Sequence, residues 1–542
     1  MSAALESRWG RETAWATVLA AFVSVVAFVI YVRNGDILLF GDAVAHINIA
    51  RRVFDSRTPG LLQLGTVWLP LPHLLMIPFL LSKSVWQTGV GGSIPSMVAY
   101  AFGVVGIFRL VRGILRASGR TESQARMTAW FAAAIYGLNP NLLYLQSTAM
   151  TESLYLALFI WALLHSSEFL QALRGSEWSA AAKGSLWKCG WCLAGACLTR
   201  YDGWLLAASI AGLVVLTARR SATGGAWRTL SAFVTLALAV PLLWLAYNAV
   251  VYRNALEFAN GPYSARAIDQ RSTVPGFPPH PGTHNLPVAA LYVLKAGEFS
   301  IAEGTLQRGW LFLAGLGLLP VFLDRRLAPL LLLGVPFPFY ALSVAYGGVP
   351  IFTPAWWPHS LYNLRYGVQL LPALAVFLAL AVHYLVCVAP SRYAKGVFAL
   401  LGVGVVVVSY ASVWRAQPGC YREAWVNSRT RLQLERSLAE QLKQLPPDAS
   451  LLMYLGEHVG ALQDAGIPLK RTINEGNHRT WKQPSDPEGL WERSLAQPGR
   501  YADFAVAFEG DRVWQAVHER GLSAVVILAV NGQQKAVIYR CR

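Results

Sequence analysis

The sequence predicts an all-α polytopic membrane domain over residues 1–414, followed by a small soluble α/β domain over residues 415–542. Hydrophobic residues make up 55% of the 542 positions and charged residues only 14%, far less charge than a soluble globule carries. Apolar stretches approaching the roughly 20 residues that cross a bilayer recur up to residue 414. The composition also excludes disorder, and six cysteines are too few for a disulfide-dense secreted scaffold.

About eleven transmembrane helices are predicted. The segments are 13–32, 93–111, 127–140, 150–167, 187–199, 203–218, 229–251, 309–323, 327–346, 364–388 and 396–414. The stretch 187–218 is also compatible with one broken helix, because polar residues divide it. The first span is expected to remain in the protein, since Glu6 and Glu12 precede it and no small-residue cleavage site follows.

Lysine and arginine predict the orientation of these spans in the membrane. They are denser in the loops that lie inside when the N-terminus is cytoplasmic, as the positive-inside rule requires. An odd number of spans then places the C-terminal domain outside the cell (inner) membrane. The net charge of +17 is therefore mainly a topology signal with some attraction to anionic lipid, and no nucleic acid is expected as a partner.

Two outer loops, 33–92 and 252–308, are too long to be simple connectors. In the first, residues 43–54 have helical amphipathic spacing, which predicts a helix resting on the outer membrane surface. Residues 68–78 are apolar but broken by prolines, as in a second surface or re-entrant piece. The second loop is a candidate lid.

The tail alternates between helical and strand patterns and is expected to be an accessory or acceptor-binding domain. Helices are predicted over 427–444 and 511–520, and strands over 451–455, 501–508, 524–530 and 536–539. Its two cysteines, Cys420 and Cys541, are compatible with a disulfide in an extracytoplasmic location.

Charged residues from distant spans are predicted to meet at the outer membrane face. Ionisable groups at membrane depth are costly and usually mark a functional cavity. Asp42 follows the first span, Glu152 begins the fourth, Arg200 and Asp202 lie between the fifth and sixth, and Arg365 begins the tenth. This set suits chemistry on a negatively charged, lipid-linked substrate.

The segments around these charges resemble the C-type glycosyltransferase superfamily, in particular the bacterial branch related to aminoarabinose transferases and protein O-mannosyltransferases. The segments are Phe40–His46, Ala149–Ser153, Leu198–Trp204, Asn363–Tyr366 and Leu371–Pro372. The resemblance covers residues 10–415 and does not clearly extend to the tail. It implies a reaction centre at an acid of the first outer loop and a polyprenyl-phosphate sugar as donor. Several members carry paired acids in that loop, whereas Ala43 follows Asp42 here, which weakens the case for a family-type metal site.

The hypothesis that follows is an inverting transfer of a sugar from a polyprenyl-phosphate donor to an unknown extracytoplasmic acceptor. Asp42 is the candidate base, and Glu152 positions the sugar or the acceptor. Arginine pairs bidentately with phosphate and stays charged, which suits a phosphate leaving group. The candidate donor-binding residues are Arg365, Arg200, Tyr366, Arg266 and Arg271, with His46, Asp202 and Asn363 in support. No cofactor is expected with certainty, and a divalent metal stays an open alternative.

Each candidate also has a structural alternative. Asp42 and Glu152 suit helix caps, and Arg200 and Asp202 suit a simple ion pair. Arg365 is compatible with a boundary arginine, and His46 with a lone surface histidine.

Some patterns fit packing or loop positions better than a site. Cys189 and Cys192 match a redox spacing but begin an apolar span without a partner pair. His280 and His284, with Glu298 and Glu303 nearby, lie in a Pro/Gly-rich loop where a metal site is not favoured.

Two other functions compete with the transferase. A flippase or transporter of a lipid-linked sugar would show two similar halves with broken helices at the bilayer midplane, and the sequence has no such halves. A receptor or scaffold leaves the outer acids and arginines unexplained.

Overall fold

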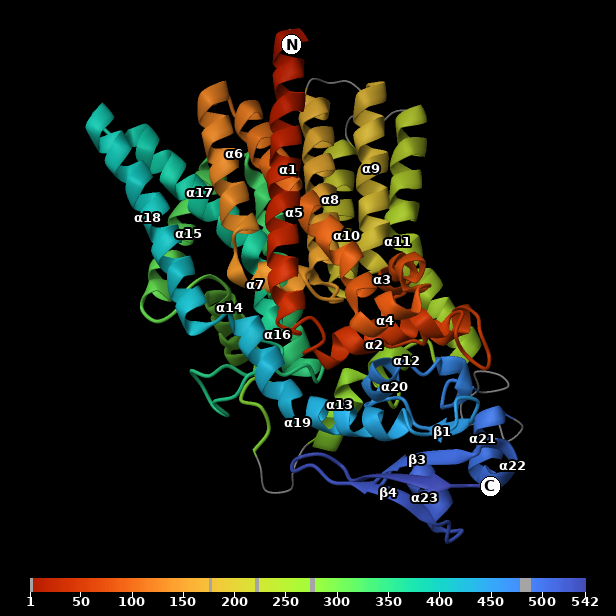
Figure 1. Cartoon of the computed structure of the whole chain (residues 1–542). Helices are drawn as coiled ribbons and strands as arrows, with labels where there is room; N and C mark the ends of the chain where they lie inside the picture. Colours follow the sequence, from red (N-terminus) through yellow and green to blue (C-terminus); the bar gives the residue numbers. More distant parts are fainter. Residues whose placement is uncertain (1–2, 175–177, 220–223, 273–277, 478–488) are drawn as a thin grey trace.

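The computed structural model describes residues 3–174, 178–219, 224–272, 278–477 and 489–542. A bundle of long helices occupies one end, and a small α/β domain lies against the other (Figure 1). The N-terminus is at the end of the bundle remote from the C-terminal domain, as the predicted topology requires.

Every predicted span coincides with a helix. The helices are α1 (Ala3–Arg33), α5 (Val90–Ala117), α6 (Glu122–Gly137), α8 (Glu152–Arg174), α9 (Ala180–Cys197), α10 (Asp202–Ala218), α11 (Gly225–Tyr252), α15 (Leu306–Leu323), α16 (Pro336–Tyr346), α17 (Leu371–Val388) and α18 (Arg392–Ala416). The short 3-10 helices η3 (Ala328–Gly334) and η4 (Leu364–Leu370) lead into α16 and α17. Separate helices α9 and α10 replace the alternative of one broken helix.

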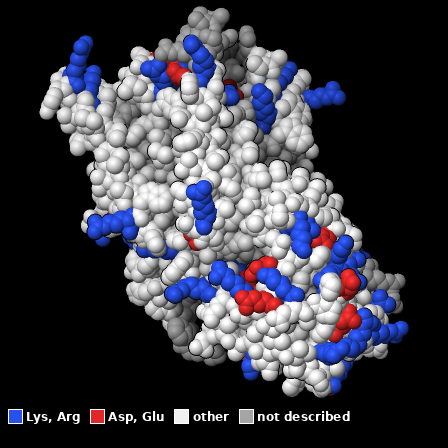
Figure 2. All heavy atoms as spheres, in the orientation of Figure 1, with Lys and Arg blue, Asp and Glu red and all other residues white. Residues whose placement is uncertain are grey.

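Eight segments of the described residues are long and apolar enough to cross a membrane. The helices α6, α9 and α10 are not among them, with 16, 18 and 17 residues. The bundle exposes large apolar side chains, such as Phe22, Phe322 and Leu400. In Figure 2 this middle zone carries few charges, while Lys, Arg, Asp and Glu gather at the two ends. The chain is thus a multi-pass membrane protein.

The first outer loop folds into short helices between the bundle and the C-terminal domain (Figure 1). They are α2 (Gly41–Arg52), η1 (Leu61–Leu64), α3 (Leu71–Met76), η2 (Ile77–Leu80) and α4 (Lys83–Thr88). The helix predicted at 43–54 is present as α2, but the prediction that it rests on the membrane surface is wrong. Both faces of α2 are covered, since polar His46, Asn48 and Arg51 are buried as well as Ile47. Gln463 of the C-terminal domain covers Asn48, whereas His73 and Leu80 of the same loop cover His46 and Arg51.

The second outer loop is mostly ordered structure. It contains α12 (Glu257–Asn260), α13 (Ala265–Ser272) and α14 (Leu286–Ile301). The prediction of a lid is wrong for α14, because residues Ala296–Ile301 are buried within the bundle. This helix was not predicted as a buried segment because it carries the charged residues Lys295 and Glu298. In the structure the two side chains pair with each other at 2.6 Å.

The C-terminal domain begins with α19 (Gly419–Leu442) and contains a five-stranded sheet. The remaining elements are β1 (Leu451–Met453), α20 (Val459–Ala465), η5 (Leu469–Arg471), β2 (Thr472–Ile473), α21 (Leu490–Ala496), α22 (Pro498–Tyr501), β3 (Phe504–Phe508), α23 (Arg512–His518), β4 (Ala524–Leu528) and β5 (Ala536–Arg540). The order is β2-β1-β3-β5-β4, with β1 parallel to β2 and β3, and β5 antiparallel to β3 and β4.

The four predicted strands and both predicted helices are present, but the proposed disulfide is wrong. Cys420 is a free, buried thiol at the start of α19, where its backbone N–H donates to Asn141. Cys541 is also free and follows β5, with its N–H bonded to the carbonyl of Asp503. The two residues therefore belong to different parts of the domain.

The C-terminal domain docks on the first outer loop through buried polar contacts. Asn48 of α2 donates to Gln463 Oε1 at 2.7 Å, and Gln463 Nε2 donates to the carbonyl of Trp86 at 2.9 Å. The N–H of Lys470 donates to Asp55 Oδ1 at 3.1 Å. These bonds fix the domain on the end of the bundle opposite the N-terminus.

Candidate functional site

Acids, arginines and tyrosines from distant segments meet where the bundle faces the C-terminal domain. We call this set the rim cluster. Its members are Asp42 on α2, Glu152 at the start of α8, Arg200 in the turn between α9 and α10, Asp202 at the start of α10, Tyr340 on α16, Arg365 and Tyr366 on η4, and Glu423 on α19. The predicted convergence of distant spans is thus present in the structure.

Carboxylates face Arg365 on three sides, two of them through hydrogen bonds. Its Nη2 donates to Asp42 Oδ2 at 2.6 Å, and its Nη1 donates to Glu423 Oε1 at 3.1 Å. Its Nε lies 3.6 Å from Glu152 Oε1. Arg365 is therefore part of a network rather than a boundary arginine that reaches toward water.

Arg200 forms the second half of the network. Its Nη1 donates to Glu152 Oε1 at 3.1 Å, and its Nε lies 3.4 Å from Asp202 Oδ1. Its Nη2 donates to the hydroxyl of Tyr340 at 2.7 Å, and that hydroxyl donates to Asp202 Oδ2 at 2.9 Å. The expected Arg200–Asp202 pair exists, and Glu152 links it to Arg365.

The ring of Tyr366 contacts both guanidinium groups. Its centroid is 5.2 Å from the guanidinium of Arg365 and 5.4 Å from that of Arg200, within cation–π range. The ring of Tyr340 stacks with it at 4.9 Å. Tyr366 therefore contributes aromatic contacts to both halves of the network.

Local backbone features place Arg365 at this point. Asn363 has a φ of 55°, in the left-handed region that asparagine tolerates better than most residues. Its side-chain amide Nδ2 donates to the carbonyl of Pro350 at 2.9 Å. Gly367 lets η4 approach α14, because a Cβ there would overlap the carbonyl of Ala296.

The members of the rim cluster differ sharply in exposure. The side chain of Asp42 is 39% exposed, whereas those of Glu152, Asp202 and Glu423 are 0%, 1% and 1% exposed. Neither Asp42 nor Glu152 acts as a side-chain helix cap in the structure: α2 has no such cap bond, and the Glu152 carboxylate faces the arginines. Asp42 is thus the one carboxylate of the cluster that a substrate can reach.

A divalent metal does not fit the rim cluster. Guanidinium groups already contact all four carboxylates. Within the described ranges, no three side chains of the metal-binding types lie together as a cation requires.

His46 is a buried residue, so the expectation of a lone surface histidine is wrong. Its Nδ1 and the Nε2 of His73 share a hydrogen bond of 2.9 Å, and Trp68 lies against its ring at 4.7 Å. Burial, assisted by the charges of Arg365 and Arg200, lowers the pKa of His46 to about 3. At neutral pH the imidazole is therefore uncharged.

Two predicted donor-binding arginines are not part of the rim cluster. Arg266 is exposed on α13. The side chain of Arg271 lies outside the described part of the structure. A role for either residue remains a prediction.

The remaining sequence patterns have structural explanations. Glu303 pairs with Arg422, and Glu298 pairs with Lys295. His280 contacts the carbonyl of Ile351 at 3.0 Å. The cysteines of α9 are free, with Cys189 fully buried.

An apolar groove of about 460 Å³ lies between α5, α8 and the segment α3–η2. Its lining includes Phe79, Val98, Phe102, Leu154 and Trp161. Leu154 is two residues beyond Glu152 on α8, but side chains at this spacing point to different faces of a helix, and the groove shares no lining residue with the rim cluster. Its chemistry suits a hydrocarbon chain.

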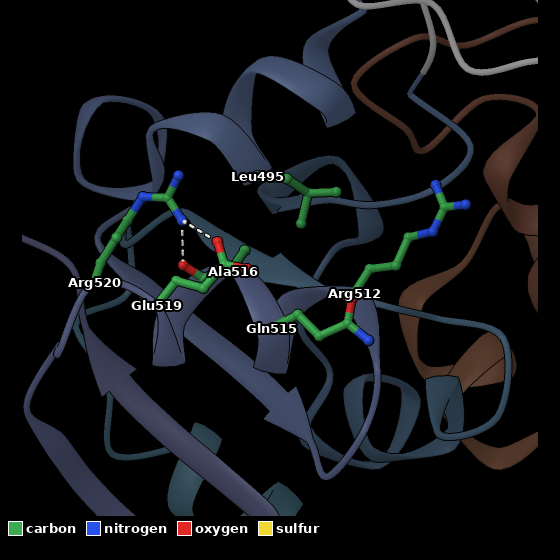
Figure 3. Close-up of a pocket in the computed structure, with 6 residues that line it drawn as sticks. All are labelled: Leu495, Arg512, Gln515, Ala516, Glu519 and Arg520. Atoms are coloured by element: carbon green, nitrogen blue, oxygen red, sulfur yellow. Dashed lines mark hydrogen bonds and ion pairs between the residues drawn. The ribbon is translucent and has the colours of Figure 1, made fainter.

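A second hollow, of about 260 Å³, lies on the C-terminal domain between α21 and α23 (Figure 3). Arg512 and Arg520 line it, but Arg520 is already bonded to the carbonyls of Ala516 and Ala496. Both arginines are exposed. The hollow shares no residue with the rim cluster, and nothing in it indicates a ligand.

Two members of the rim cluster were not predicted from the sequence. Tyr340 lies inside an apolar span, where a lone tyrosine is ordinary. Glu423 lies between the last predicted span and the predicted helix 427–444, because α19 begins earlier than the pattern indicated. Only the fold brings them to Arg200 and Arg365.

The chain has the fold of the C-type glycosyltransferases, in which a bundle of membrane helices carries a C-terminal soluble domain. The first similar structure is ArnT from Cupriavidus metallidurans bound to undecaprenyl phosphate, with a TM-score of 0.56, 14% identity, and 98% of each chain covered. The same protein in the apo state gives a TM-score of 0.53 with 16% identity, over 97% of this chain and 98% of that one. The Archaeoglobus fulgidus oligosaccharyltransferase, tethered with an acceptor peptide, gives a TM-score of 0.53 with 12% identity, over 92% of this chain and 69% of that one.

No family model matches the chain, and no curated protein sequence matches it. The resemblance seen in the motifs is confirmed at the level of the fold. It also extends further than the motifs indicated, because the aligned structures include the tail.

Proposed function

We propose that the protein is an integral-membrane glycosyltransferase, which moves a sugar from a polyprenyl-phosphate donor to an acceptor outside the cell membrane. The observation that carries the proposal is the exposure of Asp42: it is the accessible carboxylate at the edge of a buried network of acids and arginines. The undecaprenyl phosphate bound to ArnT, a protein of the same fold, supports a lipid-phosphate donor.

The donor places its hydrocarbon chain in the apolar groove and its phosphate at Arg365. Two sides of this guanidinium face the buried residues Glu152 and Glu423, so the phosphate approaches from the side of Asp42. A charge-assisted bond from Nη2 to the phosphate then replaces the bond between Arg365 and Asp42. Donor binding thereby frees Asp42 for the acceptor.

Asp42 acts as the general base of the transfer. It takes the proton of the acceptor hydroxyl while the acceptor oxygen forms a bond to the anomeric carbon. The bond from that carbon to the phosphate oxygen breaks, and the phosphate leaves with the electron pair. Arg365 and Arg200 stabilise the charge that develops on the phosphate, and the anomeric configuration inverts.

Glu152 acts as a positioning residue in this scheme. Its carboxylate is fully buried and bonded to Arg200, with Arg365 beside it. It therefore aligns both guanidinium groups from behind.

Proteoliposomes test the proposal. The wild-type chain is incubated with radiolabelled polyprenyl-phosphate sugars extracted from source cells, together with source-cell membranes that supply the acceptor. Label leaving the lipid for an acceptor, with release of polyprenyl phosphate, supports the transferase. Label that crosses the bilayer while still attached to the lipid indicates a flippase and contradicts the proposal.

A further inference from the structure

Glu423 belongs to the first helix of the C-terminal domain, yet its carboxylate ends inside the rim cluster. Its side chain is 1% exposed. Oε1 accepts the N–H of Asn363 at 2.9 Å and Nη1 of Arg365 at 3.1 Å, and Oε2 accepts the N–H of Leu364 at 2.8 Å. One carboxylate thus holds both the backbone and the side chain of the segment that carries Arg365.

The backbone bonds replace a missing helix cap. The first N–H groups of a helix have no partner inside it, and η4 has no side-chain cap of its own at Asn363. Glu423 supplies that cap from a different helix. The position of η4 therefore depends on where α19 lies.

The start of α19 is itself anchored on the bundle. The N–H of Cys420 donates to Asn141 Oδ1 at 2.8 Å, on the short helix α7 (Pro140–Gln146). Gly419 lies against Leu364 so closely that a Cβ there would come within 2.8 Å of the leucine side chain. These contacts hold the start of α19, and with it Glu423, beside η4.

We propose that Glu423 is a positioning residue for sugar transfer, and that it acts by orienting Arg365. The inference rests on the proposed function. With Nη1 held by Glu423 and Nε facing Glu152, the Nη2 edge of Arg365 is presented to Asp42 and to the donor phosphate. The C-terminal domain therefore completes the site with a residue of its own.

The test compares Glu423→Gln with Glu435→Gln. Glu435 is a matched control because it lies on the same helix, is 5% exposed, and pairs with Arg431 at 2.7 Å outside the rim cluster. Each full-length variant is reconstituted with the labelled lipid donor at a temperature where its thermal melt shows it folded. Glu423→Gln is expected to lower kcat/KM for the donor by about ten-fold or more. Glu435→Gln should stay within about two-fold of the wild type.

Restoring the charge separates positioning from mere stability. Glu423→Asp keeps a carboxylate and is expected to be more active than Glu423→Gln. The proposal is overturned if Glu423→Gln matches Glu435→Gln per folded molecule, or if Glu423→Asp is no more active than Glu423→Gln. If Glu423→Gln does not fold, Glu423→Asp against Glu435→Asp decides: a loss in the former alone supports the role, and equal activities overturn it.

Failure of this inference is distinct from failure of the proposed function. In the first case the wild type transfers sugar and the Glu423 variants transfer it equally well. In the second case the wild type transfers none.

Discussion

Replacing Asp42 by asparagine separates its chemical role from its structural one. The exchange keeps the size of the side chain and removes the charge that we assign to the base. The bond to Arg365 is short, at 2.6 Å, but the Asp42 side chain is 39% exposed. Solvent therefore screens the pair, and its loss is expected to cost about 1 kcal/mol of unfolding free energy or less.

The expected kinetic effect is much larger. A positioned general base contributes a factor of about 10² to 10⁴. At about 1.4 kcal/mol for each factor of ten, this corresponds to about 2.8 to 5.6 kcal/mol of the barrier. The transfer rate should therefore collapse while the thermal midpoint hardly moves.

The assay measures label transfer in proteoliposomes beside a thermal melt of the same preparation. Asp464→Asn is the control, because Asp464 is 48% exposed and pairs with Lys443 at 3.6 Å outside the rim cluster. It should transfer sugar like the wild type. The reasoning is refuted if Asp42→Asn retains wild-type transfer, or if its melt falls far enough to explain the loss.

Three further predictions concern Arg365, the buried His46 and the docking of the C-terminal domain. Arg365→Ala leaves buried Glu423 without its cation, while Glu152 keeps Arg200, and should cost about 3 to 5 kcal/mol of stability; an unchanged melting temperature would contradict the network. Folding lowers the pKa of His46 from 6.5 to about 3. As the pH falls below about 6.5, the unfolded chain therefore binds a proton at His46 and the folded chain does not. The free energy of unfolding should decrease by about 1.4 kcal/mol per pH unit in this range. His46→Gln should flatten this slope in melts taken from pH 7 to 4, and a slope equal to that of the wild type would count against the burial of His46. Gln463→Leu removes both docking bonds and should cost about 1 to 3 kcal/mol; limited proteolysis should then release the C-terminal domain faster, and an unchanged cleavage rate would argue that these bonds do not hold it.

The membrane helices were predictable because apolar length is a local property of the sequence. The convergence of charges was predictable for a similar reason: topology assigns Asp42, Glu152, Arg200 and Arg365 to the same membrane face once the spans are placed. Neither inference requires knowledge of which helices are neighbours.

The misses come from contacts between distant segments. Asn48 on the polar face of α2 is buried because Gln463 of α20 covers it, and no pattern within residues 43–54 indicates that contact. Glu423 reaches Arg365 only because α19 turns back under the bundle. In both cases the partner residue belongs to the C-terminal domain. Neither contact could be predicted while the tail was treated as a separate unit.

The most direct test of the central claim is a structure of the protein with polyprenyl phosphate in a lipid nanodisc. The account predicts the phosphate within hydrogen-bonding distance of the Arg365 guanidinium, the hydrocarbon chain in the apolar groove, and Asp42 released from Arg365. A phosphate bound elsewhere, with the Asp42–Arg365 bond intact, would contradict it.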